Sequence, residues 1–217
     1  MGIIMADRLS IFIDGSNFYH ALKEVHGRTD VDFKAFAKSM GSSPHGTDRS
    51  LNPVSYYNSV VDASRHPGTF AGQQRLFDYL EKADDPPFTI YRGRIEHHGR
   101  LKYNCRNCEE TLTVSTQTCP MCGSVETLRD SSEKGVDVKL AVDMVTGAIE
   151  ERYDVALLVS EDSDFVPALE AVRNHNKRIE LAILASPKRK RGYHLIRTVD
   201  WTYYMDTGDL TWYRDKR

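Results

Sequence analysis

The sequence contains no apolar run that approaches the roughly 20 residues of a membrane span, so we do not expect a membrane protein. It also lacks the glycine-rich patterns GxxxxGKS, GxxxxGKT and GxGxxG, which excludes the two common phosphate-binding loops. The net charge of −2 argues against a uniformly basic surface but leaves room for a local basic patch. The start MGIIMADRLS has no basic segment ahead of its apolar residues, so a signal peptide is not expected and the protein is expected in the cytoplasm.

Cysteine is scarce, and all four cysteines lie between Cys105 and Cys122. Disulfide scaffolds spread their cysteines along the chain, whereas metal sites cluster them. The chain has a CxxC pair, ten intervening residues and a second CxxC pair, made of Cys105, Cys108, Cys119 and Cys122. Two such pairs complete a tetrahedron around zinc, so the spacing predicts a zinc ribbon with a short strand over 111–114. A redox dithiol pair and an iron–sulfur site are the alternatives.

What is present in abundance is an alternation of apolar strands and amphipathic helices. The sequence predicts an α/β fold with a parallel sheet covered on both faces. We expect strands at 9–13, 54–61, 88–95, 155–160 and 179–184, and helices at 17–25, 31–40, 73–80, 136–153 and 166–174. Residues 41–53 read as a loop, and the tail, which holds Trp201 and Trp212, shows no clear period.

Carboxylates follow two of these strands. Asp14 comes directly after the first strand, and Asp162 and Asp164 follow the strand at 155–160. Because parallel strands end at one edge of a sheet, where open α/β sheets bind ligands, these acids are expected to converge. The alternative is local: an Asp-Gly turn at Asp14, and a helix cap with a solvated neighbour at the other two positions.

The helix expected from Val136 supplies two further acids. At about 100° per residue, one broad apolar face contains Val138, Ala141, Val142, Met144, Val145, Ala148 and Ile149. Asp137 falls within this face, where an acid needs a partner, so it is the better ligand candidate. Asp143 and Lys139 fall opposite, and Asp143 is expected to be solvated, or to support the site if the helix is rotated. Several carboxylates around Mg²⁺ or Mn²⁺ suit phosphodiester hydrolysis.

Three motifs carry a resemblance to a known family: IDGSNFY (13–19), KGVDVKLAVDM (134–144) and SEDSDF (160–165). Together, and in this order, they resemble the NYN domain of the LabA-like branch of the PIN-like nuclease superfamily. The resemblance implies a Rossmann-like, PIN-like α/β fold over 7–96 and 130–206, an inserted zinc ribbon over 97–129, and a tail over 207–217. It also implies a metal-dependent ribonuclease whose acidic cluster is Asp14, Asp137, Asp162 and Asp164.

The same resemblance assigns a supporting role to Asn17 and makes Asp143 and Lys134 second-tier site residues. The sequence departs from the family at Glu161, where glycine is usual. This substitution adds a negative charge beside the site, and it favours an alternative in which the protein binds RNA or a partner with weak or no catalysis. A phosphatase acting on small substrates is a third, weaker interpretation.

Cations and aromatic rings interleave between Arg92 and Arg106. Such a mixture suits RNA, single-stranded or structured, because cations contact phosphates and rings stack on bases. The expected RNA-binding residues are Arg92, Arg94, Arg100, Lys102, Tyr103 and Arg106. A solvated surface is the alternative. A second basic run, from Lys188 to Arg191, could contact phosphates or lie in a solvated loop.

Overall fold

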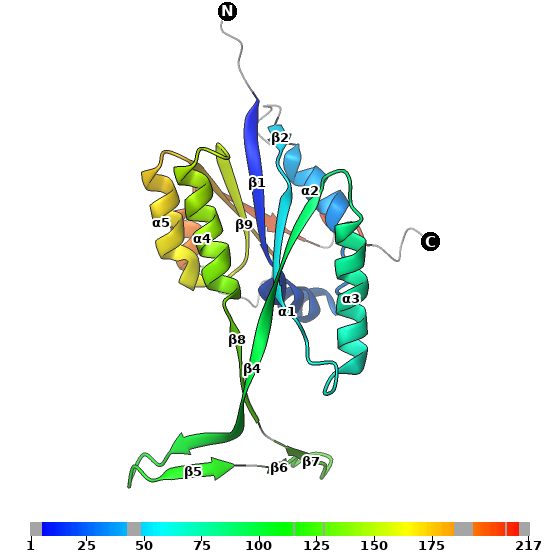
Figure 1. Ribbon diagram of the computed structural model, residues 1–217, viewed down its shortest axis with the longest axis vertical. Helices are drawn as coiled ribbons and strands as arrows, with labels where there is room; N and C mark the ends of the chain where they lie inside the picture. The colour runs from blue at the N-terminus through cyan, green and yellow to red at the C-terminus, as the bar shows by residue number, and fades with distance from the viewer. Residues whose placement is uncertain are drawn as a thin grey trace, which may run out of the picture.

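The computed structural model describes residues 6–42, 49–114, 116–127, 129–184, 193–206 and 208–212, without the side chains of 97–101, 103 and 126–133. Its central feature is a mostly parallel sheet flanked by helices (Figure 1). In spatial order the parallel strands are β11 (Trp201–Met205), β10 (Arg178–Leu184), β9 (Val155–Val159), β1 (Asp7–Asp14), β3 (Val54–Ser59) and β4 (Phe88–Asn104). A short strand, β2 (Arg49–Leu51), pairs with the start of β1. The predicted α/β class is therefore confirmed.

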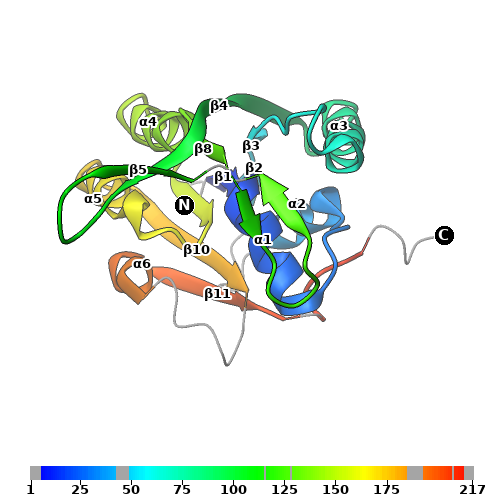
Figure 2. The same ribbon diagram turned by 90° about the horizontal axis from the view of Figure 1, so that it is seen from below.

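Two layers of helices cover the sheet, one on each face (Figure 2). The first layer contains α1 (Gly15–His26), α2 (Phe33–Gly41) and α3 (Pro67–Glu81). The second contains α4 (Val136–Ile149), α5 (Val166–Asn174) and α6 (Tyr193–Thr198), with a 3₁₀ turn, η1 (Ser163–Phe165), ahead of α5. Alternate residues of β1 serve the two cores: Leu9, Ile11 and Ile13 face the first layer, and Phe12 faces the second.

β1 lies at the point where the strand order reverses. The chain runs from β1 through β3 to β4 on one side, then returns to β9, β10 and β11 on the other. Ligands of open α/β sheets bind beyond the carboxyl ends of the strands at such a reversal. In this protein the reversal lies between β1 and β9, whose register pairs Ile13 with Val159.

An antiparallel arm extends from the carboxyl end of the sheet (Figure 1). β4 does not end near residue 95, as expected, but continues to Asn104 and pairs with β8 (Arg129–Lys134) and β5 (Thr111–Val114). The expected strand at 111–114 is thus confirmed. The arm also carries a separate pair, β6 (Thr116–Thr118) and β7 (Val125–Thr127). The change of partner, from β3 to β8, falls between Gly93 and Arg94.

Several boundaries differ from the sequence expectations. α3 begins at Pro67 rather than near residue 73, and α4 ends at Ile149 rather than 153. The region 41–53 contains β2, and the tail holds α6 and β11, which showed no period in the sequence. Both tail elements are short and contribute few buried side chains, such as Leu195 and Met205, so they leave little hydrophobic pattern.

Candidate functional site

Asp14 is held at the sheet reversal by two neighbours. The residue is 3 % exposed, and its side chain points toward the face of the sheet that α4 covers, by alternation with Phe12. Ser160, which follows β9, donates from Oγ to Asp14 Oδ2 at 3.0 Å. Asn17 donates its backbone N–H to Asp14 Oδ1 at 3.0 Å, so Asp14 caps α1. The capping role and the site position therefore coexist in one residue.

Asn17 ties α1 to the loop after β9. Its side-chain Oδ1 accepts a hydrogen bond of 3.0 Å from the backbone N–H of Glu161. Ser160 Oγ in turn accepts from the backbone N–H of Asp162 at 3.1 Å. Asn17 therefore fixes the backbone at Glu161, between Ser160 and Asp162. This contact is consistent with the supporting role that the resemblance implies for Asn17.

Asp162 precedes the short turn η1 that follows β9, and Asp164 lies within this turn. Asp162 Oδ1 accepts from the backbone N–H of Asp164 at 3.0 Å and so caps this turn. Phe165, 1 % exposed, anchors the turn in the core below α4 and α5. The cap considered as an alternative is present at Asp162, and the carboxylate of Asp164 is left exposed at the sheet edge.

Asp137 shares its surroundings with these two acids, although it comes from a different element. It occupies the first turn of α4. Partial burial raises the pKa of Asp137, and the negative charges of Asp162 and Asp164 raise it further. The acids of α4 and of the loop after β9 are therefore near enough to influence each other's ionisation.

The expected orientation of α4 is wrong. Val138, Val142 and Ile149 are more than half exposed, and the buried stripe is instead Val136, Leu140, Met144, Gly147 and Ala148. Asp137 is accordingly exposed and does not face the core. The expected face included seven apolar residues of the helix, whereas α4 packs against the sheet along a narrower stripe.

Asp143 also differs from its expected position, because it is not a solvated acid. Tyr57 donates from its hydroxyl to Asp143 Oδ2 at 2.9 Å, and Lys139 Nζ donates to Asp143 Oδ1 at 2.5 Å. The ammonium group of Lys139 also lies 6.0 Å from the ring centre of Tyr91. Asp143 therefore fastens α4 to β3 through Tyr57, which corresponds to the rotated-helix alternative.

Two residues of this network were not anticipated from the sequence. Strand register places Tyr57 beside Asp14 on one side and beside Tyr91 on the other. Side chains paired in register point to the same face, so a polar row crosses β1, β3 and β4 beneath the first turns of α4. The sequence does place Tyr57 and Tyr91 near the ends of expected strands. No sequence pattern, however, pairs either tyrosine with Asp143.

Residues 8–206 match the NYN domain. The chain belongs to the NYN domain family. This family lies within the PIN-like nuclease superfamily, in agreement with the parallel sheet and with the acids at its reversal.

Two further proteins resemble the NYN chain. A crystal structure of a protein of unknown function from Vibrio parahaemolyticus superposes with a TM-score of 0.59 at 16% identity, covering 97% of this chain and 100% of that one, and supports the fold alone. Reverse gyrase 1 of Sulfurisphaera tokodaii is 36% identical over 67 residues, 27% of this chain. That match spans 6% of the length of the reverse gyrase.

The donor set of the NYN site suits a hard divalent cation, because Asp14, Asp137, Asp162 and Asp164 offer carboxylate oxygens. The like-charge repulsion at Asp137 is what a bound cation would relieve. Among the described residues, however, no group of three or more His, Cys, Asp or Glu side chains is close enough to hold a metal ion. The cation site therefore stays a prediction.

The cysteines form two knuckles on the arm. Cys105 accepts at its carbonyl from Glu109 N at 2.8 Å, and Cys119 accepts in the same way from Gly123 N at 2.9 Å. Gly123 has φ of +71°, which a residue with a side chain rarely adopts. Each knuckle fits one half of a zinc site, but the four described cysteines do not gather into one cluster. The zinc ribbon remains a prediction.

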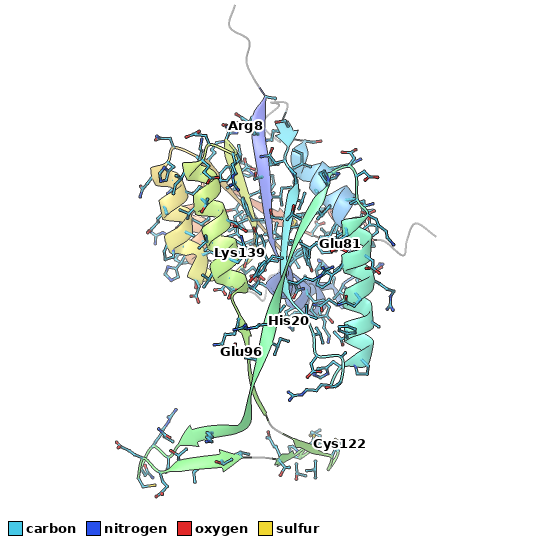
Figure 3. All side chains as sticks on the ribbon, viewed as in Figure 1. Arg8, His20, Glu81, Glu96, Cys122 and Lys139 are labelled. Carbon is cyan, nitrogen blue, oxygen red and sulfur yellow. The ribbon has the colours of Figure 1, made fainter. Side chains whose placement is uncertain are left out.

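The described residues expected to bind RNA are spread along the arm. Arg92 and Arg94 lie with Lys134 where β4 leaves the sheet. Lys102 and Arg106 lie farther along, and Arg106 belongs to the first knuckle. Figure 3 shows the extent of the arm, with Glu96 near its root and Cys122 at its far end. The side chains of Arg100 and Tyr103, and the whole run from Lys188 to Arg191, lie outside the described residues.

The described part of the chain contains no helix that is long and apolar enough to cross a membrane.

Proposed function

We propose that this NYN protein, of the LabA-like branch, is a divalent-metal-dependent ribonuclease that cleaves RNA phosphodiester bonds. The observation that carries the proposal is the electrostatic coupling of Asp137 to Asp162 and Asp164, at the sheet reversal where Ser160 holds Asp14. Acids from three separate parts of the chain lie toward this end of the sheet, which a set of local helix caps would not require.

Asp14, Asp137, Asp162 and Asp164 would hold Mg²⁺ or Mn²⁺ through their oxygens. The cation, when bound, polarises the phosphoryl oxygen and lowers the pKa of a coordinated water. Asn17 keeps the loop after β9 against α1, and Asp143 keeps α4 against β3, so both position the acids. Neither contact uses the exposed carboxylates of Asp137 and Asp164.

The arm supplies the surface for the rest of the RNA, single-stranded or structured. Cys105, Cys108, Cys119 and Cys122 would bind zinc and hold the arm in one shape, because this small segment buries little apolar surface of its own. The arm leaves the sheet at the edge that carries the acids (Figure 1). An RNA strand lying along the arm would therefore reach the acidic site. A cytoplasmic location is part of this proposal.

Glu161 favours a second candidate, an RNA- or partner-binding protein with little or no turnover. The residue is 8 % exposed and stands between Ser160 and Asp162. A buried carboxylate here adds negative charge where an RNA phosphate must approach, which opposes catalysis unless a cation compensates for it.

Incubation of the protein with single-stranded and structured RNA in the presence of Mn²⁺ separates these functions. The ribonuclease requires cleavage by the wild type and its loss in Asp162→Asn, with an unchanged far-ultraviolet circular dichroism spectrum. RNA binding without cleavage by the wild type would support the regulator. Hydrolysis confined to phosphomonoesters would support a phosphatase. Glu161→Gly is expected to raise the cleavage rate if the buried charge hinders catalysis.

A shortened arm tests the part assigned to it. Arg94 and Lys134 are directly paired in antiparallel register, so an Asn-Gly turn can join residues 94 and 134 in place of 95–133. We expect the sheet to fold and the affinity for RNA to fall. Unchanged affinity would refute the role of the arm beyond its root.

A further inference from the structure

A hollow of about 430 Å³ lies where the arm leaves the sheet. We call it the root hollow, and its lining residues are Tyr91, Arg92, Gly93, Arg94, Lys134 and Gly135. Its volume is within the range of small-ligand sites in proteins. The lining is rich in cationic side chains, unlike the acidic edge a few residues away.

Strand geometry brings the three cations of the root hollow to one face. Arg92 and Arg94 are two residues apart on β4, so their side chains project from the same side of the strand. Lys134 is the direct cross-strand partner of Arg94 and projects from that side as well. The concentration of charge therefore follows from backbone register and not from chance side-chain rotation.

Arg92 and Arg94 differ in the contacts that hold them. Arg92 pairs with Glu81 at 2.6 Å and lies 5.0 Å from the ring centre of Phe77, so its guanidinium is directed toward α3. Arg94 pairs with Glu96 at 2.7 Å, but its side chain is 78 % exposed. Exposed pairs of this kind contribute little, so a phosphate can replace Glu96 and accept two parallel hydrogen bonds from the guanidinium.

A short stretch of chain joins the root hollow to α4, although the cations project from the face of β4 opposite to Tyr91 and Gly93, which face α4. Lys134 leads through Gly135 directly into α4, so the Cα atoms of Lys134 and Asp137 lie at most about 11 Å apart. A nucleic acid strand with one phosphate at the acids would pass round the edge of the sheet to bring a later phosphate to the hollow.

We propose that the root hollow is a phosphate subsite for single-stranded RNA, in which Arg94 and Lys134 bind a backbone phosphate of a strand that also reaches the acids. This inference rests on the proposed function for the direction in which the strand leaves the hollow. Arg92 shapes the wall, and the subsite fixes the register of the strand on the protein. Backbone contacts of this kind position a nucleic acid without reading its sequence.

Binding without cleavage tests the subsite. The Asp162→Asn protein is titrated into a fluorescein-labelled single-stranded RNA of ten nucleotides, and the affinity is measured by anisotropy at several salt concentrations. Adding Arg94→Gln and Lys134→Gln is expected to lower the affinity about tenfold or more. The slope of log K against log salt should fall by about 0.7 for each lost contact. Arg94→Lys, which keeps the charge, should retain part of the affinity.

The matched control removes two cations from the other end of the sheet. Arg178 and Lys38 form exposed ion pairs with Asp7 and Asp85, and Arg178→Gln with Lys38→Gln gives the same change in net charge. The subsite is overturned if the root and control variants lose affinity and salt slope equally, or if the root variant loses neither. RNA cleavage by the wild type is measured separately. A protein that binds RNA through the root hollow but does not cleave it would contradict the proposed ribonuclease activity and leave the subsite standing.

Discussion

Gly93 lies where the sheet, the arm and α4 are in contact. A Cβ atom at this position would lie 2.3 Å from Cγ2 of Val136, 2.9 Å from Oγ of Ser59 and 3.3 Å from the carbonyl oxygen of Lys134. Val136 begins α4 and precedes Asp137, so a side chain at Gly93 would push the first turn of α4, and its acid, away from the sheet.

Gly93→Ala is therefore expected to destabilise the protein by about 1–3 kcal/mol through overpacking and to reduce RNA cleavage by displacing Asp137. Urea unfolding and the cleavage rate measure the two effects. Gly72→Ala is the matched control, because its Cβ would meet only Nη2 of Arg75, at 3.8 Å, inside α3. It should stabilise by up to about 1 kcal/mol. Equal stability of the two variants would contradict the packing account.

Asp154 gives the fold a defined sensitivity to acid. Arg8 donates to both of its carboxylate oxygens, from Nε at 3.0 Å and from Nη2 at 2.9 Å. These hydrogen bonds lower the pKa of Asp154 to about 2. Because the folded pKa lies below the unfolded one, the pair stabilises the fold above about pH 4 and loses this contribution as the pH falls toward 2.

Asp154→Asn removes that pH dependence. Both side chains are more than a third exposed, so solvent screening limits the expected loss at pH 7 to about 1 kcal/mol. The difference between wild type and variant, measured by urea unfolding at each pH, should shrink between pH 4 and pH 2. A difference that stays constant over this range would show that the ion pair does not stabilise the fold.

At the scale of elements, the described side chains of the knuckles on the arm have little apolar support. Met121, in the second knuckle, is 92 % exposed, and Val125 is 65 % exposed. A segment this open needs a metal to hold a single shape, so we expect about one zinc per chain. Cys122→Ser should lower the zinc content and speed hydrogen exchange over 97–129, with little change in the sheet.

Met121→Ala is the control for the cysteine variant, because it alters the same knuckle without removing a thiolate. Elemental analysis should find its zinc content unchanged. If Cys122→Ser retained its zinc and its slow exchange, the arm would have to be stabilised by contacts other than the metal.

The elements also show what the sequence could and could not predict. The sequence predicted the bounds of β9 and α5 to within one residue, because a buried apolar run and a 3.6-residue apolar period are local patterns that do not depend on the rest of the fold. The motif order placed Asp14 and Asp162 at neighbouring strand ends. The contact of Asp143 with Tyr57 could not be predicted, since it depends on how α4 turns against β3. The course of the arm depends on β4 changing its partner from β3 to β8. No local sequence pattern predicts this change.

At the scale of the whole molecule, a buried ion pair joins segments that are far apart in sequence. Arg49 of β2 donates to both oxygens of Glu180 of β10, at 2.9 and 2.6 Å, and Tyr203 of β11 donates to the same carboxylate at 2.9 Å. The side chains of Arg49 and Glu180 are 0 % and 2 % exposed. Two buried charges are strongly destabilising unless each is paired with the other. The Arg49–Glu180 pair therefore fixes the position of β2 relative to β10 and β11.

Removing one partner should therefore cost far more than replacing both. Glu180→Leu leaves the Arg49 guanidinium buried without its counterion, and we expect a loss of about 3–5 kcal/mol in unfolding free energy. Arg49→Met together with Glu180→Leu fills the space with apolar groups and should recover most of that loss, because neither charge then needs desolvation. Urea unfolding of the two single variants and the double variant gives the coupling energy. Equal costs for the single and double variants would mean that Arg49 reaches solvent when its partner is lost, and that β2 is not fixed by the pair.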